Sequence, residues 1–259
     1  MVGELTNLQV LVTRQFATAL PLYARIKSLG AKVQILPLFN IESLLKMEDI
    51  LQIQQQAEFS DLTICTSKNA AQIILPHLQS SKHLAWAAVG PGTARYMQAM
   101  VTKTVCYPHA PPYDSANLIA TLQASDMNLC NSKIQLFTGY DGNNELKIRL
   151  LELGAKVTVQ ELYRRTLPAI SVDVFTKLFS VEPEIDIIVI TCTTSLVNLM
   201  YFADLANIDI RRYKLLVVSN RIYKYAIRSG FLKVYVAASM STEDILSELL
   251  RSCSSILNV

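Results

Sequence analysis

Short stretches rich in hydroxyl and amide side chains recur along this chain, each after an apolar segment and before a helical pattern. In open parallel sheets, ligands bind beyond the carboxyl ends of the strands. The first N–H groups of a helix lack partners within the helix and carry partial positive charge, so these junctions suit an anionic ligand. The candidate binding residues at the junctions are Arg14, Thr66, Ser67, Lys68, Asn69, Gly92, Thr93, Gly139, Thr193, Ser219 and Arg221.

Any one of these residues can also be an ordinary helix N-cap, so the interpretation depends on the whole set. Common catalytic patterns do not occur. VGPGTA at 89–94 is an incomplete dinucleotide loop, and there is no Walker lysine and no GxSxG elbow. The three histidines, His77, His83 and His109, have no metal-ligand spacing and do not follow a strand. An enzyme with these residues would orient a reactive substrate rather than use a triad or a metal.

The elements that position these residues alternate regularly between strand and helix. Apolar strands such as 8–13, 61–66 and 185–191 are each followed by a helical pattern, and we count ten such units, five in each half. The strands are short and rich in Val and Ile, as in sheets that helices cover on both faces. We therefore predict an α/β protein with two parallel, five-stranded, flavodoxin-like lobes.

A repeat supports this division into halves. The sequence LGAKV at 29–33 recurs at 153–157, and each copy joins a helix to a strand. The likeness extends further, because 61–78 aligns with 185–202, each a strand that ends in Thr before a helix. The two halves are thus predicted to share one architecture.

Composition excludes several classes of protein. Of 259 residues, 51% are hydrophobic and 17% are charged, which is far from the composition of a disordered chain. The net charge of +3 comes from scattered Lys and Arg, so we expect no nucleic-acid partner. No apolar run is long enough to span a bilayer, and the N-terminus has no signal-peptide pattern. The five cysteines lack a CxxC spacing and are expected to be reduced thiols of a cytoplasmic protein.

Taken in order, the motifs resemble those of uroporphyrinogen-III synthase, an enzyme of tetrapyrrole synthesis. They span nearly the whole chain. The matching stretches are VLVTR at 10–14, Pro37 after the first LGAKV, TSKNA at 66–70, VGPGTA at 89–94, the glycines of 139–142, LYRR at 162–165, Ser219 with Arg221, and VYVA before Ser241. Four places depart from the family pattern. Thr138 and Asn143 stand where the family often has arginines, Ser115-Ala116 stands in place of a common Ser-Glu pair, and Thr191-Cys192 in place of Thr-Ser.

The resemblance implies two lobes joined by a two-stranded linker. Residues 1–37 with 166–259 would form one lobe and 38–165 the other, with linker strands near 35–40 and 160–167. It further implies a hydro-lyase that needs no cofactor and cyclises hydroxymethylbilane, inverting ring D, to uroporphyrinogen III of haem biosynthesis. We expect a monomer without membrane partners that can receive its substrate from the preceding enzyme of the pathway.

Tyr163 matches a family tyrosine that faces the cleft and is proposed to assist departure of the substrate hydroxyl. It can equally be an aromatic of the linker strand that packs on a lobe. A second functional interpretation stays open, a non-catalytic two-lobed protein that closes on a small anion. A nucleotide-dependent transferase would need a phosphate loop, which this sequence does not contain.

Overall fold

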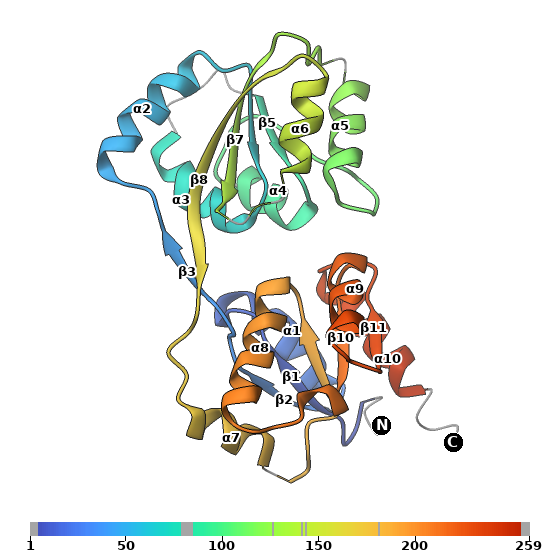
Figure 1. Ribbon diagram of the computed structural model, residues 1–259. Helices are drawn as coiled ribbons and strands as arrows, with labels where there is room; N and C mark the ends of the chain where they lie inside the picture. Colours follow the sequence, from blue (N-terminus) through green and yellow to red (C-terminus); the bar gives the residue numbers. More distant parts are fainter. Residues whose placement is uncertain are drawn as a thin grey trace. The chain divides into compact units, whose positions relative to one another are not determined.

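The computed structural model describes residues 5–78, 85–125, 127–140, 142, 144–180 and 182–254, except the side chains of Cys253 and Ser254. The chain forms two compact units (Figure 1). Unit 1 comprises Met1–Asn40 and Thr166–Val259, and unit 2 comprises Ile41–Arg165. The chain therefore passes between the units twice, within the strands Asn40–Ser43 (β3) and Lys156–Thr166 (β8).

Unit 1 is a five-stranded sheet in the order β11-β10-β9-β1-β2, in which every neighbouring pair is parallel. Its elements are β1 (Gln9–Val12), α1 (Phe16–Ser28), β2 (Lys32–Ile35), α7 (Val172–Ser180), β9 (Ile187–Ile190), α8 (Thr193–Leu205), a 3-10 turn (Ile210–Arg212), β10 (Lys214–Val217), α9 (Asn220–Arg228), β11 (Val234–Val236) and α10 (Thr242–Ser254).

Helices cover both faces of this sheet, which is why its central strands are apolar except at Gln9 and Lys214, the first residues of β1 and β10. On one face α1 and α10 pack on Val10, Val12 and Val189. On the other face α7, α8 and α9 pack on Leu11 and Ile188. Side chains of a strand alternate between faces, so a strand buried on both sides needs a continuous apolar run.

Unit 2 is a six-stranded sheet in the order β3-β8-β7-β4-β5-β6. The helices α2, α3 and α4 pack on one face, and α5 and α6 on the other. Besides β3 and β8, its elements are α2 (Met47–Glu58), β4 (Leu62–Cys65), α3 (Lys68–Leu78), β5 (Ala85–Ala88), α4 (Pro91–Gln98), β6 (Val105–Cys106), α5 (Ser115–Ala124), β7 (Lys133–Gly139) and α6 (Glu145–Glu152).

Both sheets follow the flavodoxin strand order 2-1-3-4-5. In unit 1 the order β2-β1-β9-β10-β11 follows the chain. In unit 2 the same order appears as β8-β7-β4-β5-β6, so its first two strands come last in the sequence. The predicted α/β architecture with two flavodoxin-like parallel sheets is confirmed.

The repeated LGAKV stretch is the joint between the first helix and the second strand of each pattern. Gly30 after α1 has φ +93° and Gly154 after α6 has φ +81°. This left-handed conformation ends a helix and suits glycine, because a Cβ would be strained there. The identical residues thus form the same helix-ending turn in both units.

Two details of the prediction were wrong. Unit 2 has six strands rather than five, because β3 lies beside β8 at the edge of the sheet. The helix predicted from Leu44 begins at Met47, and the Leu44 N–H instead donates to the carbonyl of Leu162 at 2.9 Å. Backbone pairing across strands distant in sequence therefore overrode the local helical pattern.

Asn198 forms a hydrogen bond with the segment that follows β2. Its side-chain Nδ2 donates to the Leu38 carbonyl at 2.6 Å, and Asn198 is only 9% exposed. We expect Asn198→Ala to lower the free energy of unfolding by about 1–3 kcal/mol, because it leaves a buried carbonyl unpaired. Urea unfolding measures the change, with the exposed Asn220→Ala as control. An Asn198→Ala midpoint equal to that of the control would contradict this role.

Candidate functional site

The hydroxyl-bearing strand ends of unit 2 meet where the strand order reverses. β4 and β7 are parallel neighbours, with Cys65 opposite Phe137. The next residues, Thr66 and Thr138, consequently lie side by side, with 3.2 Å between their Oγ1 atoms. Such a switch point is where open α/β sheets bind ligands.

Ser67 connects this point to Tyr163. Its Oγ accepts a hydrogen bond from the Ala70 N–H at 3.2 Å and so caps α3. The same Oγ lies 3.0 Å from the Tyr163 hydroxyl, at hydrogen-bond distance. Arg165 adds a third group, since its Nη2 donates to the Tyr163 hydroxyl at 3.4 Å.

A β-bulge aims Tyr163 at this position. β7 and β8 pair regularly up to Thr138 opposite Glu161, and then Gly139 is opposite Tyr163, so Leu162 is the extra residue. A bulge of this kind re-aims a side chain at the rim of a sheet. Tyr163 is 2% exposed and its ring belongs to the core under α3 and α4.

Gly139 makes room for the tyrosine. A Cβ at this position would lie 2.7 Å from the Tyr163 Cζ and 3.0 Å from its hydroxyl oxygen. At Gly92 the situation is the opposite, because a Cβ there would meet no atom within 4 Å. Of the two predicted glycines, only Gly139 is required by a close approach.

The remaining predicted residues of unit 2 have less defined surroundings. Lys68 is exposed at the start of α3, and its Nζ lies 5.5 Å from the centroid of the Tyr96 ring. Asn69 is partly buried, and Thr93 is 8% exposed in the first turn of α4. They lie at the ends of β4 and β5, which are adjacent in the sheet. Among the predicted residues of unit 2, Ser67 and Gly139 are the ones that contact Tyr163, and Thr66 contacts Thr138.

In unit 1 four predicted residues follow adjacent strands. Arg14 follows β1, Thr193 begins α8 after β9, and Ser219 with Arg221 follow β10. Ser219 caps α9, since its Oγ accepts from the Ile222 N–H at 3.4 Å. Arg221 is exposed, and the structure shows no side-chain contact among these four within the part of the chain that it describes.

Of the three cationic residues predicted to bind the ligand, Arg14 is the one that is partly buried. Burial lowers the pKa of its guanidinium, although an arginine stays charged at neutral pH. Its Nη1 donates to the Met240 carbonyl at 3.5 Å, and it forms no ion pair with any described residue. A partly buried positive charge without a carboxylate partner suits an anionic ligand.

Sequence reasoning missed two features of this region. Arg165 was noted as part of the LYRR motif but not assigned to the site, although it contacts the Tyr163 hydroxyl. The bulge was not predicted, because no local pattern marks it. Thr138 lies in the hydroxyl pair, whereas Asn143, another departure from the family pattern, lies outside the described residues.

Cys65, at the end of β4, is chemically protected. It is fully buried, and burial raises the pKa of its thiol far above the ordinary value. Cys130 is exposed, and both are free thiols. We expect iodoacetamide at pH 8 to alkylate Cys130 in the native protein and Cys65 only in urea, because the thiolate is the reactive form. Peptide mass spectrometry measures both rates. Equal native rates would show that β4 opens readily.

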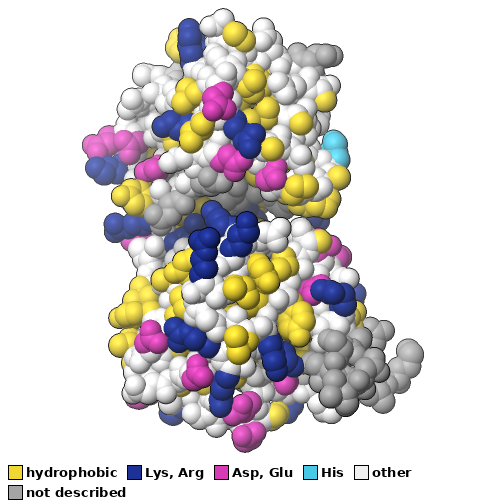
Figure 2. Space-filling view, turned by 45° about the vertical axis from the view of Figure 1, so that its right-hand side comes forward, with side chains coloured by type: hydrophobic (Ala, Val, Ile, Leu, Met, Phe, Trp, Pro, Cys, Tyr) yellow, Lys and Arg dark blue, Asp and Glu magenta, His cyan; other side chains and the backbone are white. Residues whose placement is uncertain are grey.

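Two general properties bear on the class of protein. Across the described residues, no cluster of three or more His, Cys, Asp or Glu could hold a metal ion, and His83 is outside them. No helix in the same part of the chain is both long and apolar enough to cross a membrane. On the face in Figure 2, acidic and basic side chains are interspersed on each unit.

The fold and the site define a two-unit α/β protein with hydroxyl-lined strand ends suited to an anion. A scan against protein-family models matches residues 21–247 to uroporphyrinogen-III synthase HemD. The chain therefore belongs to the uroporphyrinogen-III synthase family, cyclising hydro-lyases of haem biosynthesis that act on hydroxymethylbilane. No curated protein matches the sequence.

Solved structures of this family share the fold. A uroporphyrinogen-III synthetase from Helicobacter pylori is 16% identical, with 95% of this chain and 99% of that chain covered and a TM-score of 0.65. A mutant uroporphyrinogen III synthase from Thermus thermophilus is 18% identical, with 96% and 99% covered and a TM-score of 0.58. At these identities the likeness concerns the fold, and the site rests on the residues described above.

Proposed function

We propose that this chain converts hydroxymethylbilane to uroporphyrinogen III with Tyr163 as the group that assists departure of the substrate hydroxyl. The observation that carries the proposal is the contact of 3.0 Å between the Tyr163 and Ser67 hydroxyls beside Gly139. It supports a phenol held at the carboxyl edge of the sheet, where a ligand of this fold is expected.

The chemistry needs one proton at the start and releases one at the end. The Tyr163 phenol gives its proton to the leaving hydroxyl, which departs as water. The resulting azafulvene carbon is attacked by the last pyrrole, and ring D inverts through a spiro intermediate. In the spiro intermediate the bond between ring D and its original methylene carbon breaks. The free α carbon of ring D then closes the macrocycle and loses a proton, which returns to the phenolate.

The proposed binding groups match a substrate with eight carboxylates. Helix N-termini with their capping hydroxyls supply N–H donors, and Lys68, Arg14 and Arg221 supply positive charge. Many hydrogen-bond donors contribute to substrate binding. Removal of one of these side chains is therefore expected to weaken binding without abolishing turnover. The residues come from both units, so each of the proposed lobes, 1–37 with 166–259 and 38–165, is expected to carry binding groups.

Product analysis tests the proposal directly. Hydroxymethylbilane cyclises unaided to the type I isomer, so the protein should shift the product to type III without added metal or cofactor. Type I alone, at the uncatalysed rate, would overturn the enzyme assignment and revive the interpretation as a non-catalytic anion-binding protein, which the family match does not favour.

We further propose a monomer in the cytoplasm that takes its substrate from the preceding enzyme. The free thiols of Cys65, Cys106, Cys130 and Cys192 support a reducing compartment. Direct transfer is supported by chemistry, because a substrate that cyclises unaided is lost if it waits in solution. Gel filtration at working concentration tests the monomer, and isomer ratios in a coupled assay test the transfer.

A further inference from the structure

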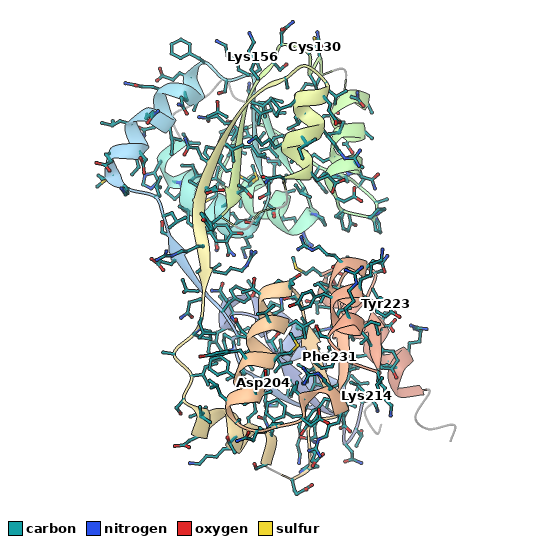
Figure 3. All side chains as sticks on the ribbon, viewed as in Figure 1. Cys130, Lys156, Asp204, Lys214, Tyr223 and Phe231 are labelled. Atoms are coloured by element: carbon teal, nitrogen blue, oxygen red, sulfur yellow. The ribbon has the colours of Figure 1, made fainter. Side chains whose placement is uncertain are left out.

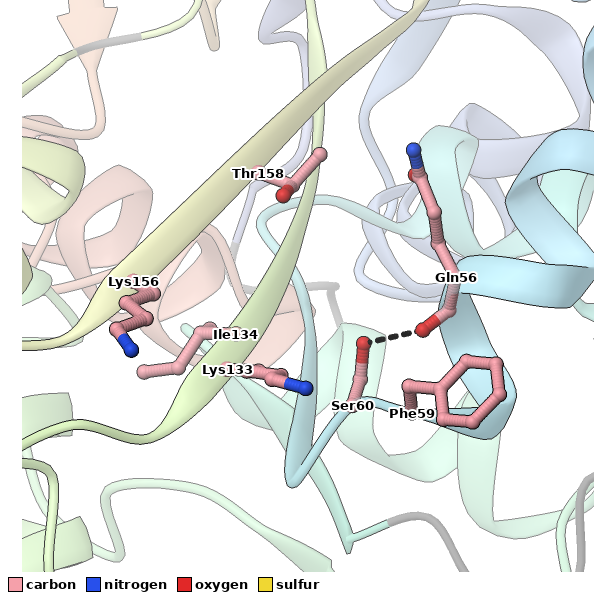
Figure 4. Close-up of a pocket in the computed structure, with 7 residues that line it drawn as sticks. All are labelled: Gln56, Phe59, Ser60, Lys133, Ile134, Lys156 and Thr158. Carbon is pink, nitrogen blue, oxygen red and sulfur yellow. Dashed lines mark hydrogen bonds between the residues drawn. The ribbon is translucent and has the colours of Figure 1, made fainter.

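Unit 2 has a hollow of about 410 Å³ that the proposed function does not use (Figure 4). It lies between the end of α2 and the first residues of β7 and β8, and its polar lining is Gln56, Ser60, Lys133, Lys156 and Thr158. A volume of this order is typical of sites for small molecules. The hollow is at the amino ends of the strands, whereas the Tyr163 group is at their carboxyl ends.

The mouth of the hollow is positively charged. Lys133 and Lys156 begin β7 and β8 and are register partners, and Figure 3 labels Lys156 at this end of the unit. Both side chains are exposed, and neither forms an ion pair with a described residue. A carboxylate is near, since Asp61 Oδ2 accepts the Lys133 backbone N–H at 2.7 Å, so one of the two positive charges is partly offset.

Beneath the hollow a polar row crosses the sheet. Thr63 on β4, Gln135 on β7 and Thr158 on β8 are in register, so their side chains share the face covered by α2. Thr63 is fully buried and Gln135 is 1% exposed. Polar side chains at such positions, inside strands that are otherwise apolar, need hydrogen-bond partners.

Three buried oxygens have no hydrogen-bond partner among the described residues: Gln56 Oε1, Thr63 Oγ1 and Gln135 Oε1. Of these residues, Gln56 lines the hollow, whereas Thr63 and Gln135 belong to the sheet and are not lining residues. The Gln135 amide is oriented by its Nε2, which donates to the Ile53 carbonyl on α2 at 3.3 Å, so its oxygen is the atom left open. Gln56 lies three residues further along the same helix. Buried unpaired acceptors cost free energy, so a donor from outside the chain is favoured here.

We propose that this hollow binds a small hydroxylated anion, such as a sugar phosphate or a hydroxy acid. Its phosphate or carboxylate would contact Lys133 and Lys156, and its hydroxyls would donate to the side-chain oxygen of Gln56, the only one of the three residues with an unpaired oxygen that lines the hollow. A metal cation fits less well, because two ammonium groups at the mouth repel it. A trapped water could satisfy the oxygens, but it would give no reason for the lysine pair.

Calorimetric titration of the full-length protein with glycerol 3-phosphate tests the site. We expect saturable binding of one equivalent, weakened at least tenfold in Lys133→Gln/Lys156→Gln and at least fivefold in Gln56→Met, which keeps the side-chain length. The matched control is Lys177→Gln/Lys233→Gln, which loses the same charge from exposed positions of unit 1. Inorganic phosphate should bind more weakly than glycerol 3-phosphate, and glycerol should not bind.

Absence of saturable binding, or equal affinity in the lysine variant and its control, would overturn the proposal. Equal binding of phosphate and glycerol 3-phosphate would also overturn it, because the buried oxygen of Gln56 would then play no part. The lysine variant should still make the type III isomer, so a failure here is distinguishable from a failure of the proposed enzyme activity.

Discussion

Tyr163→Phe is expected to lower turnover by about 100-fold while the product remains type III. General acid assistance is worth roughly 10²–10⁴-fold in typical enzymes, and the low end applies because the pyrrole nitrogen already helps to expel the hydroxyl. The ring is 2% exposed and packs in the core, so phenylalanine keeps its contacts and the fold. What is lost is the hydroxyl that lies 3.0 Å from Ser67 Oγ.

Tyr213→Phe is the matched control. Tyr213 is also buried, at 4% exposure, and its hydroxyl accepts a hydrogen bond from Arg212 Nη2 at 2.9 Å. It lies in unit 1 before the amino end of β10, not at the carboxyl ends of the strands. Steady-state rates and isomer analysis of both variants separate chemistry from packing. If Tyr163→Phe turns over like Tyr213→Phe, then Tyr163 is a packing residue and the proton comes from water or from the substrate carboxyls.

Gly139→Ala should lower both stability and turnover. The added methyl would lie 2.7 Å from the Tyr163 Cζ, so the tyrosine ring or the backbone must move. Overpacking of this kind costs typically about 1–3 kcal/mol of unfolding free energy. A displacement of about 1 Å at a reacting group can reduce the rate by up to about 10²-fold, so we expect a loss of roughly 10- to 100-fold.

Gly92→Ala is the control for this substitution. It makes the same chemical change at another predicted glycine, where a Cβ meets nothing within 4 Å. Its unfolding midpoint and turnover should stay close to those of the parent protein. Urea unfolding and steady-state assays of both variants give the comparison. Equal turnover of Gly139→Ala and Gly92→Ala would show that the Tyr163 position does not limit the reaction.

The architecture was predictable because local sequence patterns indicate its strands, helices and turns. Sheets covered on both faces favour apolar strands. The run 187–190 is continuously apolar and 62–65 is apolar except for Thr63, and both were recognised as strands. Gly30 and Gly154 mark the same helix end twice, and both adopt positive φ. The candidate binding residues were located at strand ends by the same reasoning, because parallel strands place their carboxyl ends at one edge.

The contacts that give these residues a role were not predictable in this way. The bulge that brings Tyr163 opposite Gly139 depends on the pairing of β7 with β8, and the Thr66–Thr138 pair depends on β4 lying beside β7. The sixth strand of unit 2 likewise forms only because β8 offers it an edge. The hollow beside α2 was also not predicted, because its lining residues come from the end of α2 and just after it, from β7 and from β8, which are distant in the sequence.

The sequence by itself therefore determined the class of fold, the family and the edge of each sheet at which a ligand is expected. These follow from periodicity, turn residues and the order of motifs, all of which act over a few neighbouring residues. Only the tertiary structure decided which of those residues touch. Hydrogen bonds such as Ser67 to Tyr163 and close approaches such as Gly139 to Tyr163 join residues far apart in the chain, and strand register sets their distances.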